Sequence, residues 1–285
     1  MKYPAETIAA VKRSLSATNG KRQEQIAAEH CVSRSLVSDI WTGRCHADEM
    51  SRTTLHPDAS SRVLVIGDTH CPGMRKGYID FLKRIADGYS VNRVVHIGDL
   101  VDWASISYHE KMPTLSNASA EYKKAKKQVS KLVKAFPQAD WLIGNHDALT
   151  SRQAHTAGLP TEILRDYGDL WDVPWTVHPR FAKLTIDNVI YSHGDSGAAG
   201  KGAAFRQAKD NFRSTVIGHF HSQAGVNWWA NPEYRVFSMS VGCGIDAAKL
   251  QFEYGRKFPS KPILGCGVVI DGRKAYFEPW LLKSR

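Results

Sequence analysis

Short apolar runs alternate with helix-like patterns along the chain from Arg62 onward. The runs are rich in β-branched residues and span positions 63–66, 93–97, 140–143, 189–192 and 215–217. Between them, apolar residues recur at the spacing of amphipathic helices over 77–88, 118–136 and 200–211. We expect the segment 234–280 to supply further strands that close the sheet. This alternation predicts an α/β core.

The helix expected over 118–136 has an apolar face and a basic one. The apolar face carries Tyr122, Ala125, Val129, Leu132, Val133 and Phe136. Lysines cover much of the remaining surface, at Lys123, Lys124, Lys126, Lys127, Lys131 and Lys134. We expect a solvated amphipathic helix, since such helices place charge opposite their buried stripe. A lysine stripe that faces nucleic acid is the alternative.

The first 45 residues are helical in pattern and poor in strand-like runs. Residues 46–61 lack apolar periodicity and are rich in Ser, Thr, Asp and Pro, which is typical of a linker. We therefore expect a small all-α domain over 1–45, a linker over 46–61 and the main domain over 62–285.

Composition adds an argument about partners and compartment. The 285-residue chain has a formal net charge of +10, which favours polyanionic partners such as nucleic acid. Its five cysteines are odd in number and irregularly spaced, which argues against a disulfide framework and favours a reducing compartment. The sequence shows no secretory h-region and no apolar run near the ~18 residues of a membrane span. We expect a cytoplasmic protein without a membrane partner.

A polar motif accompanies the end of each of the five predicted strands. In chain order these motifs are GDTH at 67–70, GDLVD at 98–102, GNHD at 144–147, SHGD at 192–195 and GHFH at 218–221. Ligands of α/β sheets bind outside the carboxyl ends of the strands, in one crevice. Glycine allows the tight turns and close backbone approach that such a site needs. The five motifs are therefore expected to form one site.

The side chains of these motifs are typical metal ligands. They comprise two aspartates, one asparagine and four histidines: Asp68, His70, Asp99, Asn145, His193, His219 and His221. Oxygen ligands mixed with imidazole suit Mn, Fe, Zn or Ni better than Ca or Mg. Seven ligands exceed one tetrahedral ion and suit two ions ~3.5–4 Å apart that share a carboxylate and acidify the water between them. We expect two divalent ions, with manganese favoured.

The order of the motifs resembles that of the calcineurin-like metallophosphoesterases, over roughly 62–221. The resemblance implies an α/β (α+β) fold in which a two-sheet β-sandwich is flanked by helices, giving four layers. It implies one ion bound by Asp68, His70 and His221, a second bound by Asn145, His193 and His219, and Asp99 as the bridge between them. It also implies that His146 protonates the leaving oxygen as a general acid, with Asp102 orienting or tuning it.

Two positions depart from the family pattern. Many phosphomonoesterases of the family carry an arginine directly after the GDxxD motif, to grip phosphate, where this chain has Trp103. The GNHE of many members is GNHD here, with Asp147. The missing arginine weakens the interpretation as a protein phosphatase and leaves the metal chemistry unchanged. Arg152 and Lys201 are candidates to grip phosphate in its place.

Residues 22–44 resemble the helix-turn-helix of DNA-binding regulators. Small or apolar side chains stand where two crossed helices touch, and Cys31 takes the place of the usual turn glycine. The resemblance implies that Ser33 caps the second helix. It also implies that the residues facing the major groove are Ser33, Arg34, Ser35, Ser38 and Asp39. A helical bundle used for oligomerisation or docking is the alternative.

Together these features predict a two-metal phosphoesterase that hydrolyses phosphodiesters. We favour a nuclease or phosphodiesterase directed at DNA by the N-terminal helices. A phosphomonoesterase of proteins or small molecules, with a helical docking module, is the alternative. A DNA-binding regulator with a vestigial site is disfavoured because all seven ligand positions and His146 are present.

Overall fold

The computed structural model describes residues 11, 14, 23–34, 37, 38, 60–109, 117–246 and 261–281. By its internal contacts the chain divides into two units, 1–59 and 60–285, and each is described by itself. Most of the expected linker, 46–59, lies outside the described residues. Its last two residues belong to the larger unit, because Ser60 Oγ donates to the Asp271 carboxylate at 2.8 Å and Ser61 is buried.

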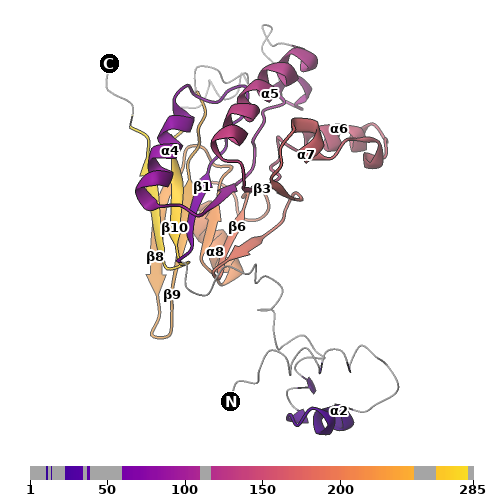
Figure 1. The fold of residues 1–285 in the computed structure, drawn as a ribbon, viewed down its shortest axis with the longest axis vertical. Coiled ribbons are helices and arrows are strands. Elements are labelled where there is room, and N and C mark those ends of the chain that lie inside the picture. Colours follow the sequence, from indigo (N-terminus) through magenta and orange to yellow (C-terminus); the bar gives the residue numbers. More distant parts are fainter. Residues whose placement is uncertain are drawn as a thin grey trace. The chain divides into compact units, whose positions relative to one another are not determined.

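The first sheet of the larger unit has six strands in the order β11-β10-β1-β2-β3-β4 (Figure 1). The strands are β1 (Arg62–Ile66), β2 (Arg93–His96), β3 (Asp140–Leu142), β4 (Thr176–His178), β10 (Gly265–Ile270) and β11 (Lys274–Pro279). β1 to β4 pair in parallel, while β10 and β11 add an antiparallel edge. The carboxyl ends of β1, β2 and β3 therefore meet at one edge of this sheet.

The second sheet has five strands in the order β5-β6-β7-β9-β8. The strands are β5 (Leu184–Ile186), β6 (Val189–Ser192), β7 (Thr215–Ile217), β8 (Ala224–Ala230) and β9 (Arg235–Val241). β6, β7 and β9 are parallel, and β5 and β8 are antiparallel edges. The C-terminal strands thus extend both sheets, where the sequence pattern suggested only one.

Helices pack on the outer faces of both sheets. They are α4 (Tyr78–Tyr89), η2 (Ala104–Ile106), α5 (Ala118–Ala135), α6 (Leu149–Thr156), η3 (Thr161–Ile163), α7 (Tyr167–Trp171) and α8 (Ala203–Asn211). α4 and α5 lie close together beside β1 (Figure 1). α8 packs against β7 and β9 of the second sheet. None of the helices in the described residues is long and apolar enough to span a bilayer.

The alternating side chains of β1 show how the layers are held together. Val63 and Val65 point into a core between the sheets that includes Phe237 and Met239 of β9. Leu64 and Ile66 point the other way, into a core shared with α4 and α5. A third cluster joins α8 to β7 on the far side of the second sheet. The expected fold is confirmed: a two-sheet sandwich with helices outside, in four layers.

The smaller unit has a described helix, α2 (Gln23–Glu29), followed by a turn. The backbone of Cys31 in this turn is left-handed, with φ of 50°. Helical structure is described again at Arg34, Val37 and Ser38. Its buried apolar residues form one cluster, with Val32 packed against it: Val11, Ile26, Ala27 and Val37.

Candidate metal centre and active site

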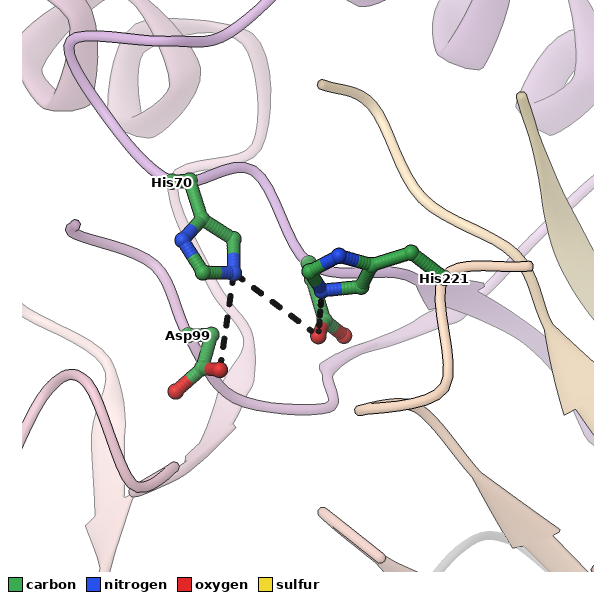
Figure 2. Close-up of side chains that lie close together, drawn as sticks. His70, Asp99 and His221 are labelled. Carbon is green, nitrogen blue, oxygen red and sulfur yellow. Dashed lines mark hydrogen bonds and ion pairs between the residues drawn. The ribbon is translucent and has the colours of Figure 1, made fainter. Parts of the chain in front are cut away.

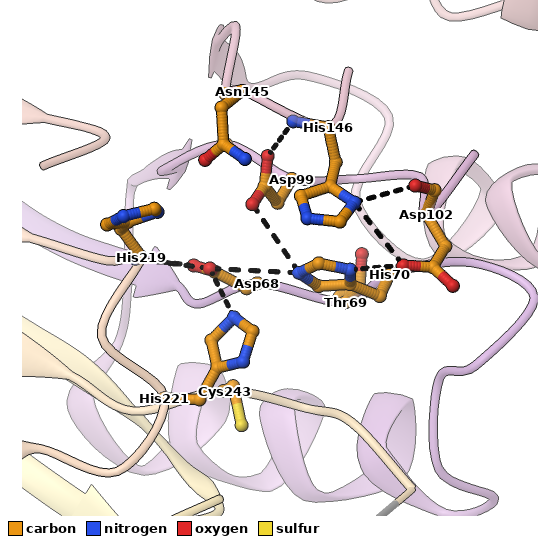
Figure 3. Close-up of polar contacts among 12 residues, drawn as sticks. Asp68, Thr69, His70, Asp99, Asp102, Asn145, His146, His219, His221 and Cys243 are labelled. Carbon is orange, nitrogen blue, oxygen red and sulfur yellow. Dashed lines mark hydrogen bonds and ion pairs between the residues drawn. The ribbon is translucent and has the colours of Figure 1, made fainter. Parts of the chain in front are cut away.

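The five polar motifs converge on one place, at the carboxyl ends of strands from both sheets. GDTH follows β1, GDLVD follows β2, and GNHD follows β3 in the first sheet. SHGD spans the end of β6, and GHFH follows β7 in the second sheet. Figure 3 shows the side chains of these loops gathered together. Residues more than 150 positions apart, such as Asp68 and His221, are in direct contact there.

One group of potential ligands is formed by Asp68, His70, Asp99 and His221 (Figure 2). His221 Nε2 lies 2.9 Å from Asp68 Oδ2. His70 Nε2 faces both carboxylates, 4.0 Å from Asp68 Oδ2 and 3.5 Å from Asp99 Oδ2. Two carboxylates and one imidazole from loops of the first sheet thus meet an imidazole from a loop of the second.

A second group is formed by Asp99, His193 and His219. His193 Nε2 lies 3.3 Å from Asp99 Oδ2 and 3.1 Å from Asn145 Oδ1. Asn145 therefore belongs to this group, although its side chain carries no charge. Asp99 is common to both groups, which is the geometry a bridging carboxylate requires.

The electrostatics of the centre favour positive charge between the carboxylates. Burial alone would raise the pKa of Asp99, but the neighbouring His193 and His146 hold it well below its usual range. Burial would lower the pKa of His193, yet Asp99 raises it to about 10. The same opposition raises the pKa of His70 well above its usual value, through Asp102 and Asp99. Neighbouring histidines thus stabilise the ionised forms of both buried carboxylates, Asp68 and Asp99.

The residues present fit divalent metal ions. His70 Nε2 is buried and, within the described part of the chain, has no hydrogen-bond partner. Its other ring nitrogen, Nδ1, is fixed 2.7 Å from Asp102 Oδ1. His193 Nδ1 is likewise fixed, 3.0 Å from the Ile97 carbonyl oxygen, so its Nε2 is directed into the centre. Metal-ligating histidines characteristically have their second nitrogen held in this way.

Three of the candidate ligands have an unusual backbone conformation. His70, Asp99 and His219 are left-handed, with φ of 43°, 49° and 63°. Non-glycine residues rarely adopt this conformation, and when they do they cluster at functional sites. Gly144 packs so closely on Asp99 that a Cβ there would overlap its carboxylate. The tight turns place the carboxylate where both groups reach it.

His146 lies at the edge of the centre, and its ring contacts the backbone of Asp102. His146 Nδ1 is 2.7 Å from the Asp102 carbonyl oxygen. A carbonyl oxygen accepts hydrogen bonds, so Nδ1 is the donor, and Nε2 lies on the side of the ring away from this bond. The Asp102 carboxylate lies 3.4 Å from His146 Nδ1 but only 2.7 Å from His70 Nδ1. The Asp102 side chain therefore orients His70 more closely than it orients His146. The His146 backbone N–H also donates to Asp99 Oδ1 at 2.8 Å.

The two positions that depart from the family pattern have structural roles. Trp103 is 7% exposed and its ring packs against Trp171 and Tyr122, at 5.2 and 6.1 Å between centroids. A buried aromatic thus fills the place of the phosphate-gripping arginine. Asp147 accepts hydrogen bonds from the backbone N–H groups of Val101 and Gly144, at 3.1 and 3.0 Å. It ties two ligand-bearing loops together.

Four further residues are of interest beside the candidate ligands. Glu121, on α5, is buried and accepts from the backbone N–H groups of Ala104 and Ser105, at 2.8 and 2.9 Å. Sequence reasoning missed it, because an acidic residue in an otherwise lysine-rich helix gives no local signal. Arg152 donates from Nη1 to the Asn145 carbonyl oxygen at 3.1 Å, whereas Lys201 is exposed on the loop before α8. Cys71 is buried, which raises the pKa of its thiol to about 12 and leaves it unreactive.

The residues expected to face DNA are only partly described. Ser33 and Arg34 are exposed, and Ser38 is half-buried. Arg34 Nη1 lies 3.2 Å from the Glu24 carboxylate, in an exposed ion pair. Ser35 and Asp39 lie outside the described residues.

One protein-family model matches the chain. The family model for calcineurin-like phosphoesterases matches residues 61–249, which include all five motifs. Among solved structures, the chain is similar to vacuolar protein sorting 29 from Cryptosporidium parvum, with 15% identity and a TM-score of 0.39 over 74% of this chain and 86% of that one. It is also similar to Yfce, a phosphoesterase from E. coli, with 10% identity and a TM-score of 0.35 over 73% of this chain and 87% of that one. No curated protein sequence matches the chain.

Proposed function

Because the chain belongs to the calcineurin-like phosphoesterases, we propose that it is a two-metal phosphodiesterase that acts on DNA. The observation that carries the metal chemistry is the shared position of Asp99, within 3.5 Å of His70 Nε2 and 3.3 Å of His193 Nε2. One ion would be held by Asp68, His70 and His221, and the other by Asn145, His193 and His219. When bound, such a pair supplies Lewis acidity and an activated water to phosphoryl chemistry.

His146 is the proton donor in this proposal. Its Nδ1 is fixed by the Asp102 carbonyl, so the proton for a leaving oxygen comes from Nε2. The side chain lies beside the candidate ligands, with its ring centroid 4.5 Å from that of His70. A general acid must reach the leaving oxygen within hydrogen-bond distance, and this position supports that role.

The preference for diesters rests on what surrounds the metal centre. A phosphomonoester carries one more negative charge than a diester, and the arginine that would match it is replaced by buried Trp103. The net charge of +10 favours a polyanionic substrate. Both features support a nucleic-acid diester over a phosphorylated protein.

The N-terminal unit is the proposed means of bringing the enzyme to DNA. The left-handed backbone at Cys31 supports a helix-turn-helix, because its turn needs a residue with positive φ after the first helix. In this proposal Ser33, Arg34 and Ser38 face the major groove, together with Ser35 and Asp39. For the metal centre we favour manganese, because the oxygens of Asp and Asn and the ring nitrogens of His are suitable ligands for it.

The test is a substrate comparison with the purified full chain in manganese. We expect turnover of bis(p-nitrophenyl) phosphate and of DNA to exceed that of p-nitrophenyl phosphate. The DNA arm is tested by electrophoretic mobility shift with Arg34→Ala, and with Arg273→Ala, also an exposed arginine, as the matched control. Turnover of monoesters alone would refute the diester assignment. Equal DNA affinity of Arg34→Ala and Arg273→Ala in the mobility-shift assay would refute the DNA-binding assignment.

A further inference from the structure

An open cavity of about 400 Å³ lies where α6 meets the segment after η2. It is lined by Tyr108, Arg152, His155 and Thr156. Its volume falls in the range of sites that bind small molecules, roughly 300–1,000 Å³. None of the seven candidate ligands is among the residues that line it.

The cavity adjoins the centre through Arg152. The Arg152 guanidinium lines the cavity and donates from Nη1 to the carbonyl oxygen of Asn145 at 3.1 Å. Asn145 lies beside Asp99 in the centre, and His146 follows it directly (Figure 3). The hydrogen bond from Arg152 to the backbone of Asn145 thus links the lining of the cavity to a loop that carries a candidate ligand.

The walls of the cavity are held in place by hydrogen bonds. Thr156 Oγ1 donates to the Arg152 carbonyl oxygen at 2.9 Å. It therefore accepts from the Tyr108 hydroxyl, 2.8 Å away, since threonine has a single hydroxyl proton. Gln153 Nε2 donates to the Ile106 carbonyl oxygen at 2.6 Å and joins α6 to η2. The tyrosine ring is thus positioned before any ligand arrives.

The walls of the cavity combine an aromatic ring with a cation. Arg152 Cζ lies 5.2 Å from the centroid of the Tyr108 ring, so a cation covers part of one aromatic face. The Tyr108 side chain remains 50% exposed and offers ring surface for stacking. Aromatic rings combined with arginine are the means by which proteins bind unpaired bases and their phosphates.

We propose that this cavity binds the nucleoside attached to the scissile phosphate, with its base stacked on Tyr108 beside Arg152. The inference rests on the proposed function, because it assigns a substrate class to the same centre. A base inside a duplex is stacked and paired, and it must leave the helix to enter such a cavity. The proposal therefore makes single strands and frayed ends the better substrates.

The test compares two inhibitors that differ only by a base. Thymidine 5′-monophosphate and 2-deoxyribose 5-phosphate are measured as competitive inhibitors of bis(p-nitrophenyl) phosphate turnover by the full chain in manganese. Stacking on an aromatic side chain is expected to make the nucleotide about 5- to 100-fold the stronger inhibitor. Tyr108→Ala removes this difference, and Tyr108→Phe keeps it, because the ring survives without the hydroxyl.

A matched control is Tyr234→Ala, since Tyr234 is a tyrosine of similar exposure, 53%, beyond the end of β8. It is expected to keep the preference for the nucleotide, and manganese content is expected to be equal in all variants. If the wild type cleaves only p-nitrophenyl phosphate, the diester assignment fails, and the same inhibitor pair measured against that substrate still tests the cavity. Equal inhibition of the wild type by the two compounds overturns the inference. The inference is also overturned if phosphotyrosine inhibits more strongly than thymidine 5′-monophosphate and this inhibition is lost in Tyr108→Ala. The cavity would then fit a protein side chain and not a nucleoside.

Discussion

Asp99 is the residue on which both candidate ion sites depend. Its Oδ2 lies 3.5 Å from His70 Nε2 and 3.3 Å from His193 Nε2, and its Oδ1 accepts from the His146 backbone at 2.8 Å. Its backbone is left-handed, with φ of 49°, a conformation that aspartate and asparagine tolerate better than most residues. Asparagine is therefore a replacement that removes the charge and keeps the turn.

We expect Asp99→Asn to lose the metal pair and reduce hydrolysis to background. An amide has no negative charge to share between two cations, so the affinity of both positions falls together. Metal content is measured by inductively coupled plasma mass spectrometry on dialysed protein, alongside turnover. Asp210→Asn, an exposed aspartate on α8, is the control and is expected to keep both ions. Full metal content in Asp99→Asn would contradict the bridging role.

His146 is expected to act on the leaving group and not on metal binding. His146→Ala should lower cleavage of DNA by about 10²–10⁴-fold, the usual contribution of a general acid. The loss on bis(p-nitrophenyl) phosphate should be smaller, because p-nitrophenolate leaves without being protonated. The backbone bond from residue 146 to Asp99 is kept in this variant, so metal content should not change. Equal losses on both substrates would exclude proton donation.

The sequence predicted the members of the centre better than their contacts. Each ligand stands within four residues of the end of an apolar run, and that spacing placed Asp68, Asn145 and His193 at one edge. It did not predict that the Asp102 carboxylate contacts His70 at 2.7 Å, and that its backbone carbonyl contacts His146. Such partners depend on loop conformation, which residue spacing does not fix.

At the scale of elements, the site depends on how η2 is attached to α5. Glu121 sits in the first turn of α5 and accepts from both Ala104 and Ser105, at 2.8 and 2.9 Å. The residues it holds follow Asp102 and Trp103, so it fixes the end of the second motif. Burial raises the pKa of Glu121, and the hydrogen bonds oppose that shift.

Glu121→Ala should lower the free energy of unfolding by about 2 kcal/mol, because two backbone N–H groups lose their acceptor in a buried place. Urea unfolding followed by circular dichroism measures this change. Lys131→Ala, an exposed residue on the same helix, is expected to differ from the wild type by less than about 0.5 kcal/mol. An equal effect of the two substitutions would show that η2 is held by other contacts.

Elements were predictable where their patterns are long or strongly apolar. The five expected strands lie within one residue of those observed, because β-branched runs mark buried strands. The strands β4 and β5 and the helix α7 were missed, because they are short and, unlike the equally short β3 and β7, are not followed by a polar motif that marks them. Helix α6, with the sequence LTSRQAHT, is mostly polar and is set by its packing beside η2.

For the whole molecule, the charge surplus and the separate N-terminal unit concern how substrate is reached. A formal charge of +10 is spread over a chain whose metal centre is lined by buried carboxylates. In the proposed function, the surplus acts outside the centre, on phosphates that flank the one being cleaved. Neutralising phosphates releases counterions, so affinity that arises in this way weakens as salt rises.

We expect the logarithm of DNA affinity to fall linearly with the logarithm of salt concentration. Arg34→Ala should reduce the magnitude of this slope by about one, because one phosphate contact is lost, and should leave turnover of bis(p-nitrophenyl) phosphate unchanged. The slope is measured by fluorescence anisotropy with a labelled oligonucleotide. Calcium replaces manganese in this assay, because it suits the Asp and His ligands poorly and is expected to allow binding without cleavage. If Arg34→Ala alters cleavage of bis(p-nitrophenyl) phosphate but leaves the salt dependence of DNA affinity unchanged, Arg34 does not contact DNA. The two readouts separate delivery of DNA from its hydrolysis, which the division into two units leads us to expect.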